Sequence, residues 1–146
     1  MLTKPKYGWT SIKIKDFECR ASYLTWVPID CLEAMIRAIE ERLDFLCTFD
    51  AEGWEFKVIS DDYRTYIINE AEYPSKLTQI EDIDKFDLAK ELIDDIESNI
   101  EDWYDFPGFH IPENEDDEFD DTEDYNKYKK ELDSLLEKLK KLINKV

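Results

Sequence analysis

Residues of the types that most often carry out catalysis are few in this chain of 146 residues. His110 is the one histidine, and the three cysteines, Cys19, Cys31 and Cys47, form no Cys-x-x-Cys pair. Each cysteine lies in an apolar or strand-like pattern, where burial keeps a thiol protonated and unreactive. A cysteine nucleophile activated by His110 is therefore disfavoured, and we expect the protein not to be an enzyme.

Nucleotide and metal sites are also disfavoured. Gly8, Gly53 and Gly108 are the only glycines and stand apart from one another, so neither a phosphate-binding loop nor a dinucleotide fingerprint can form. A single histidine without paired cysteines excludes a zinc site. Residues 113–118 are rich in oxygen ligands but lack the Asp-x-Asp-x-Asp-Gly spacing of a calcium loop. We therefore predict no cofactor and no specific metal site.

Charge is distributed very unevenly along the chain. Its 19 basic and 37 acidic residues give a formal net charge of −18, and residues 94–124 contain fifteen acidic residues but no lysine or arginine. Such a field repels nucleic acids and anionic lipids and attracts basic surfaces. We therefore expect a basic protein partner, with nucleases among the candidate classes, and we expect no direct nucleic-acid binding and no membrane partner.

Aromatic residues interrupt the charges of this acidic segment. One interpretation is a solvated loop that only keeps the protein soluble. The alternative is a binding surface, in which aromatic rings anchor the partner and charges steer its approach. On the second interpretation the partner-binding residues are Asp102, Asp105, Phe109, Glu113, Glu115, Asp116, Asp117, Glu118, Phe119, Asp120 and Asp121. Trp103 continues the apolar face of a predicted helix, so we expect it in the core.

Alternation of polar and apolar residues predicts two β-hairpins. The first combines residues 11–15 with residues 19–25, and the second combines residues 54–58 with residues 63–69. Turn-forming residues lie between the two strands of each pair. Both hairpins belong to the first half of the chain.

Helical spacing of apolar residues appears in two further stretches. An acidic capping box begins a predicted helix at about residues 30–45, and a second helix is predicted from about residue 84 to residue 104, before Pro107 and Gly108. Residues 70–83 show no clear period and are expected to form a loop.

An acidic loop over residues 107–121 leads to a last predicted helix, for which Thr122 is the expected N-cap. Apolar residues of this helix recur every three or four positions, as in a coiled-coil dimer. Leu136 and Ile143 widen the apolar stripe, which favours packing of the helix on the chain's own core. A monomer is therefore favoured over a homodimer formed through this helix.

These elements predict the α+β class, with an antiparallel sheet of two hairpins, an intervening helix and two further C-terminal helices. We divide the chain into a core domain (residues 1–106), the acidic loop (residues 107–121) and a C-terminal amphipathic helix packed on the core (residues 122–146). The beginning of the chain predicts no secretory signal, and no stretch reaches membrane-spanning length. An odd number of unpaired cysteines suits a reducing compartment, so we expect the protein in the cytoplasm.

Three stretches of the first half carry a family resemblance: residues 12–17, residues 21–25 and Gly53-Trp54-Glu55-Phe56 with the hairpin that follows. In this order around a helix, they resemble the small bacterial immunity proteins encoded beside polymorphic or contact-dependent toxins. The resemblance covers about half of the chain and includes no catalytic residue. It implies a cytosolic inhibitor that binds one cognate toxin and blocks its active site. The charge also fits an alternative, an acidic DNA mimic of a mobile element that acts on a host DNA-binding or defence protein.

Overall fold

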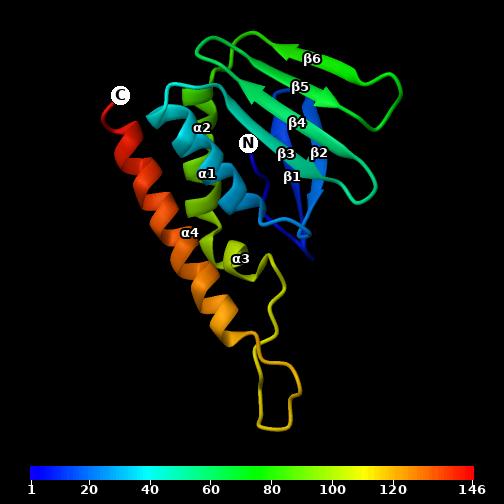
Figure 1. The fold of residues 1–146 in the computed structure, drawn as a ribbon, viewed down its shortest axis with the longest axis vertical. Coiled ribbons are helices and arrows are strands. Elements are labelled where there is room, and N and C mark those ends of the chain that lie inside the picture. The colour runs from blue at the N-terminus through cyan, green and yellow to red at the C-terminus, as the bar shows by residue number, and fades with distance from the viewer.

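Two antiparallel sheets and four helices build the structure, a computed structural model that describes residues 1–146 (Figure 1). The strands are β1 (Trp9–Ile14), β2 (Phe17–Ser22), β3 (Phe45–Asp50), β4 (Glu55–Ser60), β5 (Thr65–Asn69) and β6 (Lys76–Ile80). The helices are α1 (Val27–Glu40), α2 (Lys85–Ser98), α3 (Ile100–Asp105) and α4 (Thr122–Ile143). The predicted α+β class is confirmed. None of the helices is both long enough and apolar enough to span a membrane.

The first predicted hairpin is confirmed as β1 and β2, which pair along their whole length. Ile12 and Ile14 are buried on one face of β1, as alternation requires. The two hairpins lie in separate sheets and not in one. These sheets meet at the rings of Phe17 on β2 and Phe56 on β4, whose centroids are 5.9 Å apart.

The second predicted hairpin is confirmed as β4 and β5, the two central strands of a sheet with the order β3-β4-β5-β6. Its inward side chains, which include Phe56, Val58 and Ile67, are buried in the hydrophobic core. Helix α1 contacts the edge strand β3, and β2 also lies against β3.

The outer strands β3 and β6 differ from the prediction. Residue 45 ends the predicted helix, and Leu46 lies at helical spacing from residues before it. In the structure Leu46 points outward, whereas Phe45, Cys47 and Phe49 alternate inward as in a strand. The prediction of a loop over residues 70–83 was wrong because β6 lies within it. Only Ile80 of this edge strand is buried, so the sequence carries no alternating pattern there.

The helix boundaries differ from the expected ones for local reasons. Helix α1 begins at Val27, with Pro28 in its first turn, and ends at Glu40, before the expected end near residue 45. Arg42, at a φ of 57°, then turns the chain toward β3. The predicted helix over residues 84–104 is divided at Asn99, whose φ of −129° is not helical.

Helix α4 lies along α1 and α2, and its lower end meets α3 (Figure 1). Its apolar stripe enters the common core through Tyr128, Leu132, Leu136 and Leu139. Asp121, and not the expected Thr122, is the N-cap residue. Two ion pairs flank the stripe: Lys138 Nζ lies 2.7 Å from Glu40 of α1, and Lys140 Nζ lies 2.6 Å from Glu97 of α2.

Tyr128 connects α4 to α3 inside the core. Its side chain is fully buried, and its hydroxyl donates a hydrogen bond of 2.8 Å to the backbone carbonyl of Trp103, which is also fully buried. Burial raises the pKa of the Tyr128 hydroxyl, so the group remains a donor. This bond fixes the start of α4 against α3.

Replacing Tyr128 by Phe is expected to lower the free energy of unfolding by about 1–2 kcal/mol, because the Trp103 carbonyl loses the shorter of its two hydrogen bonds and keeps only that from the Phe106 amide. Tyr125→Phe is the matched control, since the half-buried Tyr125 makes no side-chain hydrogen bond. Urea denaturation of both variants measures the difference. Equal stabilities of the two variants would contradict the role given to the hydroxyl.

Two carboxylates approach each other where α1 and α4 meet. Partial burial is the main reason that the pKa of Glu33 is raised, and Glu131 of α4 and Asp30 add like charge beside it. The folded state therefore favours the protonated form of Glu33. Its contribution to stability is present below the ordinary glutamate pKa and is lost as the pH rises through the raised pKa.

We expect Glu33→Gln to raise the free energy of unfolding at about pH 7, by less than about 1 kcal/mol, and to leave it unchanged at about pH 3.5. Glu40→Gln, on the same helix, should have the opposite sign at neutral pH because it removes the ion pair with Lys138. Urea titrations at both pH values provide the comparison. The same sign for both variants at neutral pH would rule out the repulsion between Glu33 and Glu131.

Candidate protein-binding surface

The acidic segment, residues 94–124, covers one end of the molecule. It runs through the end of α2, all of α3, the connecting loop and the first turn of α4. The loop extends away from the body below α3 and the start of α4 (Figure 1). None of residues 110–121 belongs to the hydrophobic core or packs against it. Seven of the fifteen acidic residues of the segment therefore lie on a projection.

Hydrogen bonds within the loop close its base. The backbone amide of His110 donates to a carboxylate oxygen of Asp121 at 2.8 Å, and the amide of Asp121 donates to the carbonyl of His110 at 2.8 Å. Nearer the tip, the amide of Glu113 donates to the carboxylate of Asp117 at 2.8 Å, and that of Asp116 donates to the side chain of Asn114 at 3.0 Å. The loop thus has a defined shape without a core of its own.

The acidic side chains of the loop fall into two groups. Asp117, Asp120 and Asp121 accept backbone amides and hold the loop together, and hydrogen bonds from Thr122 lower the pKa of Asp120. The other carboxylates make no ion pair and accept no hydrogen bond; they are Glu113, Glu115, Asp116 and Glu118. Only this second group is free to meet a partner without cost to the loop.

The two aromatic residues predicted to bind a partner have different surroundings. Phe119 lies on the loop with 70% of its surface exposed. Phe109 is half-buried and packs edge-to-face with Trp26 and Tyr128, at centroid distances of 6.2 and 5.7 Å. The structure therefore gives Phe109 a packing contact that the sequence did not indicate, whereas Phe119 is free. Trp103 is fully buried, as expected.

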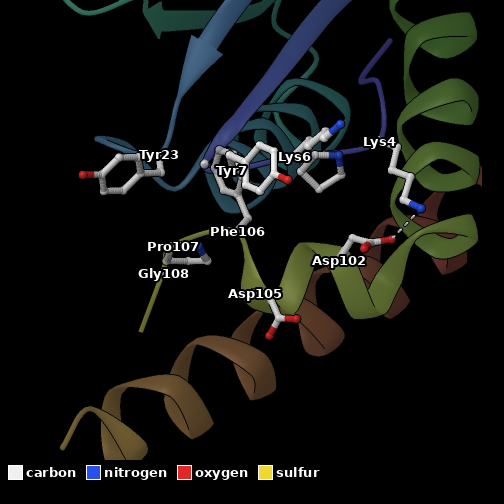
Figure 2. Close-up of a pocket in the computed structure, with 11 residues that line it drawn as sticks. Lys4, Lys6, Tyr7, Tyr23, Asp102, Asp105, Phe106, Pro107 and Gly108 are labelled. Atoms are coloured by element: carbon white, nitrogen blue, oxygen red, sulfur yellow. Dashed lines mark ion pairs between the residues drawn. The ribbon is translucent and has the colours of Figure 1, made fainter. Parts of the chain in front are cut away.

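The two predicted aspartates of α3 lie at a hollow beside the loop. Asp102 and Asp105 line it from α3, and Lys4, Tyr7 and Tyr23 line it from the first hairpin and the segment before it (Figure 2). The Nζ of Lys4 lies 3.8 Å from Asp102, while Asp105 has no ion pair. Sequence patterns did not identify the residues of the first hairpin as part of this site. The one sequence feature that could have drawn attention to them is Tyr7-Gly8, a pair of turn residues before β1.

The cysteines and His110 are not arranged as a catalytic pair. Cys31 and Cys47 are buried with their Sγ atoms 3.8 Å apart, and burial raises the pKa of the Cys31 thiol. Cys19 is half-exposed on β2. The Nε2 of His110 lies instead 3.6 Å from the carboxylate of Asp117.

No group of three or more His, Cys, Asp or Glu side chains is placed to hold a metal ion. Comparisons with family models, curated proteins and solved structures found no match to this chain. The surface that stands out is the acidic end, with its closed loop, four unpaired loop carboxylates and adjacent hollow.

Asp121→Ala is expected to loosen the loop, because it removes the carboxylate that accepts the His110 amide. The ¹⁵N order parameters of residues 111–120 should fall from about 0.85 toward about 0.6. Glu118→Ala is the control, since the Glu118 carboxylate makes no hydrogen bond. Unchanged order parameters in the Asp121 variant would show that the loop keeps its shape without this bond.

Proposed function

We propose that this protein is a cytosolic inhibitor of the immunity type. It binds a basic surface of one toxin and occludes the toxin's active site. The observation that carries the proposal is the acidic loop, whose base is closed by hydrogen bonds and whose remaining carboxylates have no partner within the chain. A loop that only solubilises the protein needs negative charge but needs no fixed shape.

Fixed shape matters for binding because ordering a flexible loop on contact costs free energy. In this loop Asp117 and Asp121 already order the backbone, so the free carboxylates can meet a partner with little further loss of entropy. Phe119 adds an exposed ring among them, and aromatic rings are typical anchors of protein interfaces. A nuclease is a suitable target class, since its active site attracts phosphate through basic residues.

The remaining charges of the chain leave the negative electrostatic field strongest at the acidic end. Lys138 and Lys140 of α4 are paired with acidic residues of α1 and α2, far along the helix from the loop. Between residues 94 and 124 the chain has no lysine or arginine to offset its carboxylates. A basic partner is therefore attracted mainly toward the loop and α3. Three free thiols are compatible with the reducing cytosol that this function requires.

The direct test is neutralisation in cells. The chain is expressed together with a toxic protein encoded next to its own gene, and growth should be restored by this chain but not by an empty vector. The same two proteins, purified, then give the association rate by stopped flow. Failure to restore growth and to bind any neighbouring gene product would overturn the proposal.

Charge steering predicts how the association rate should respond to mutation. The variant Glu115→Gln/Asp116→Asn/Glu118→Gln removes free carboxylates without touching the bonds that shape the loop, so at low salt association should slow about three- to tenfold. The matched control, Asp44→Asn/Glu52→Gln/Glu72→Gln, removes the same formal charge at exposed positions elsewhere.

The control triple variant should associate at nearly the wild-type rate, and raised ionic strength should abolish the difference between the two variants. Equal slowing by both would show that only total charge matters and that the loop is not the binding surface. Tight binding to several unrelated nucleic-acid-binding proteins, in place of one toxin, would instead identify a DNA mimic.

A further inference from the structure

The outer face of the four-stranded sheet carries a continuous apolar patch. Every second residue of β3 to β6 points away from the core, and the strand register aligns these outward residues in rows across the sheet. In one row Ile59 lies between Leu46 and Tyr66. In the adjacent row Ile68 lies beside Leu77. Directly paired side chains of an antiparallel sheet lie about 5 Å apart, so these five residues form one surface, the outer patch.

The rest of the chain leaves the outer patch uncovered. None of its residues belongs to the hydrophobic core or packs against it. Leu46 and Leu77 are 53% and 62% exposed, and the other three are half-buried among their neighbours in the sheet. Helix α1 borders the patch at β3, where Glu33 and Arg37 line a shallow hollow together with Leu46. Sheet faces that meet water are usually polar, so an apolar one indicates a surface that a partner covers.

The outer patch is also nearly free of charge. Its two rows contain eight residues, completed by Thr48, Lys57 and Gln79, and Lys57 is the one charged residue among them. The Lys57 ammonium is paired with the carboxylate of Glu70. Since 38% of the chain is charged, about three charges are expected among eight positions of ordinary surface. The face is thus neutral as well as apolar, on a chain whose net charge is −18.

Charge decides which partner this face suits. A basic surface is attracted to the acidic loop, which lies at the opposite end of the molecule from the four-stranded sheet (Figure 1). An acidic partner is repelled by the net charge. A second copy instead offers the same neutral, apolar face. The contact then lies far from both acidic loops, where the repulsion between the two copies is weakest.

We propose that two copies of this chain pack outer patch against outer patch and form a symmetric dimer. Face-to-face packing of antiparallel sheets is the arrangement of a β-sandwich, with apolar side chains interdigitated between the sheets. Lys57 brings no unpaired charge into the contact because Glu70 already neutralises it. Glu33 and Arg37 lie at the border, where a charged rim is usual. The dimer goes beyond the proposed function and leaves both acidic loops free.

The first measurement is sedimentation equilibrium of the full chain. The apparent mass should rise from 17.5 kDa toward twice this value as the concentration increases through about 10–100 µM, because a contact of this size supports only weak association. Raising the NaCl concentration from about 50 to about 500 mM should lower the dissociation constant about three- to tenfold, because salt screens the repulsion between two negative copies. Binding of a basic toxin to the acidic loop should respond to salt in the opposite direction.

Two double variants separate the outer patch from exposed apolar residues elsewhere. Leu46→Lys/Leu77→Lys should weaken dimerisation at least about tenfold, because it places charges in the contact. The added lysines also lower the net negative charge, so increased repulsion cannot explain a weaker dimer. The matched control, Leu24→Lys/Val146→Lys, changes residues that are 58% and 75% exposed outside the sheet, and it should alter the dissociation constant less than about twofold.

Methyl NMR of the wild-type chain tests the surface without any substitution. The methyl signals of Ile59, Ile68 and Leu77 should shift as the concentration rises from about 10 to about 500 µM, whereas those of Ile12 and Ile14, which are buried, should not. Intermolecular NOEs between labelled and unlabelled copies should involve the same outer methyl groups.

A mass that stays at 17.5 kDa up to about 500 µM overturns the dimer. Equal weakening by both double variants also overturns it, as does dissociation by salt, which would indicate that an acidic loop contacts a basic surface of the other copy. If the chain stays monomeric and Leu46→Lys/Leu77→Lys weakens toxin binding, the toxin and not a second copy covers the patch. Restored growth tests the proposed function separately, since the acidic loop needs no dimer to bind.

Discussion

The arrangement of the acidic end depends on the hydrogen bond from the Tyr128 hydroxyl to the Trp103 carbonyl. It joins two buried aromatic residues, one on α4 and one on α3, and so sets the distance between the helices on either side of the loop. With both ends of the loop held, His110 and Asp121 can meet and close its base. Packing of Phe109 on Trp26 and Tyr128 adds a contact from the loop's first residues to the same place.

A second constraint is the repulsion expected of a chain with a net charge of −18. The structure offsets it locally where helices pack, through Lys138 and Lys140, and leaves it unopposed where the chain projects into solvent. Near Glu33 and Glu131 the offset is incomplete: the pKa of Glu33 is raised mainly by partial burial and further by the like charges of Glu131 and Asp30. On the proposed function, stability and recognition therefore make opposite demands on acidic residues at different places.

Sequence patterns predict well those elements that have one face in water and one in the core. The hairpin strands β1, β2, β4 and β5 follow from alternation, and the start of α2 near Asp84 follows from the return of helical spacing. Strand β6 is not predicted because an edge strand with one buried residue, Ile80, has no alternation to detect. Strand β3 is not predicted because Leu46 fits the helical period of the preceding segment, although its side chain points outward in the structure.

The acidic site, too, has a part that the sequence predicts and a part that it does not. Composition alone identifies the segment, but which carboxylates are structural depends on hydrogen bonds that no spacing rule reveals. Asp117 and Asp121 look like Glu115 and Asp116 in the sequence, yet only the first two hold the backbone. Tyr7 and Tyr23 join the site through tertiary packing of the first hairpin near α3, which a linear pattern does not contain.

The closed base of the loop separates the tip from the folding of the body. Residues 111–120 contribute nothing to the core, and the bonds that restrain their ends belong to His110 and Asp121. The identity of Glu115, Asp116, Glu118 or Phe119 is thus not constrained by the need to fold. On the proposed function, substitutions at these tip positions can therefore change the partner one residue at a time without altering the body. The scaffold then permits rapid divergence of recognition while the parts that fold the molecule stay unchanged.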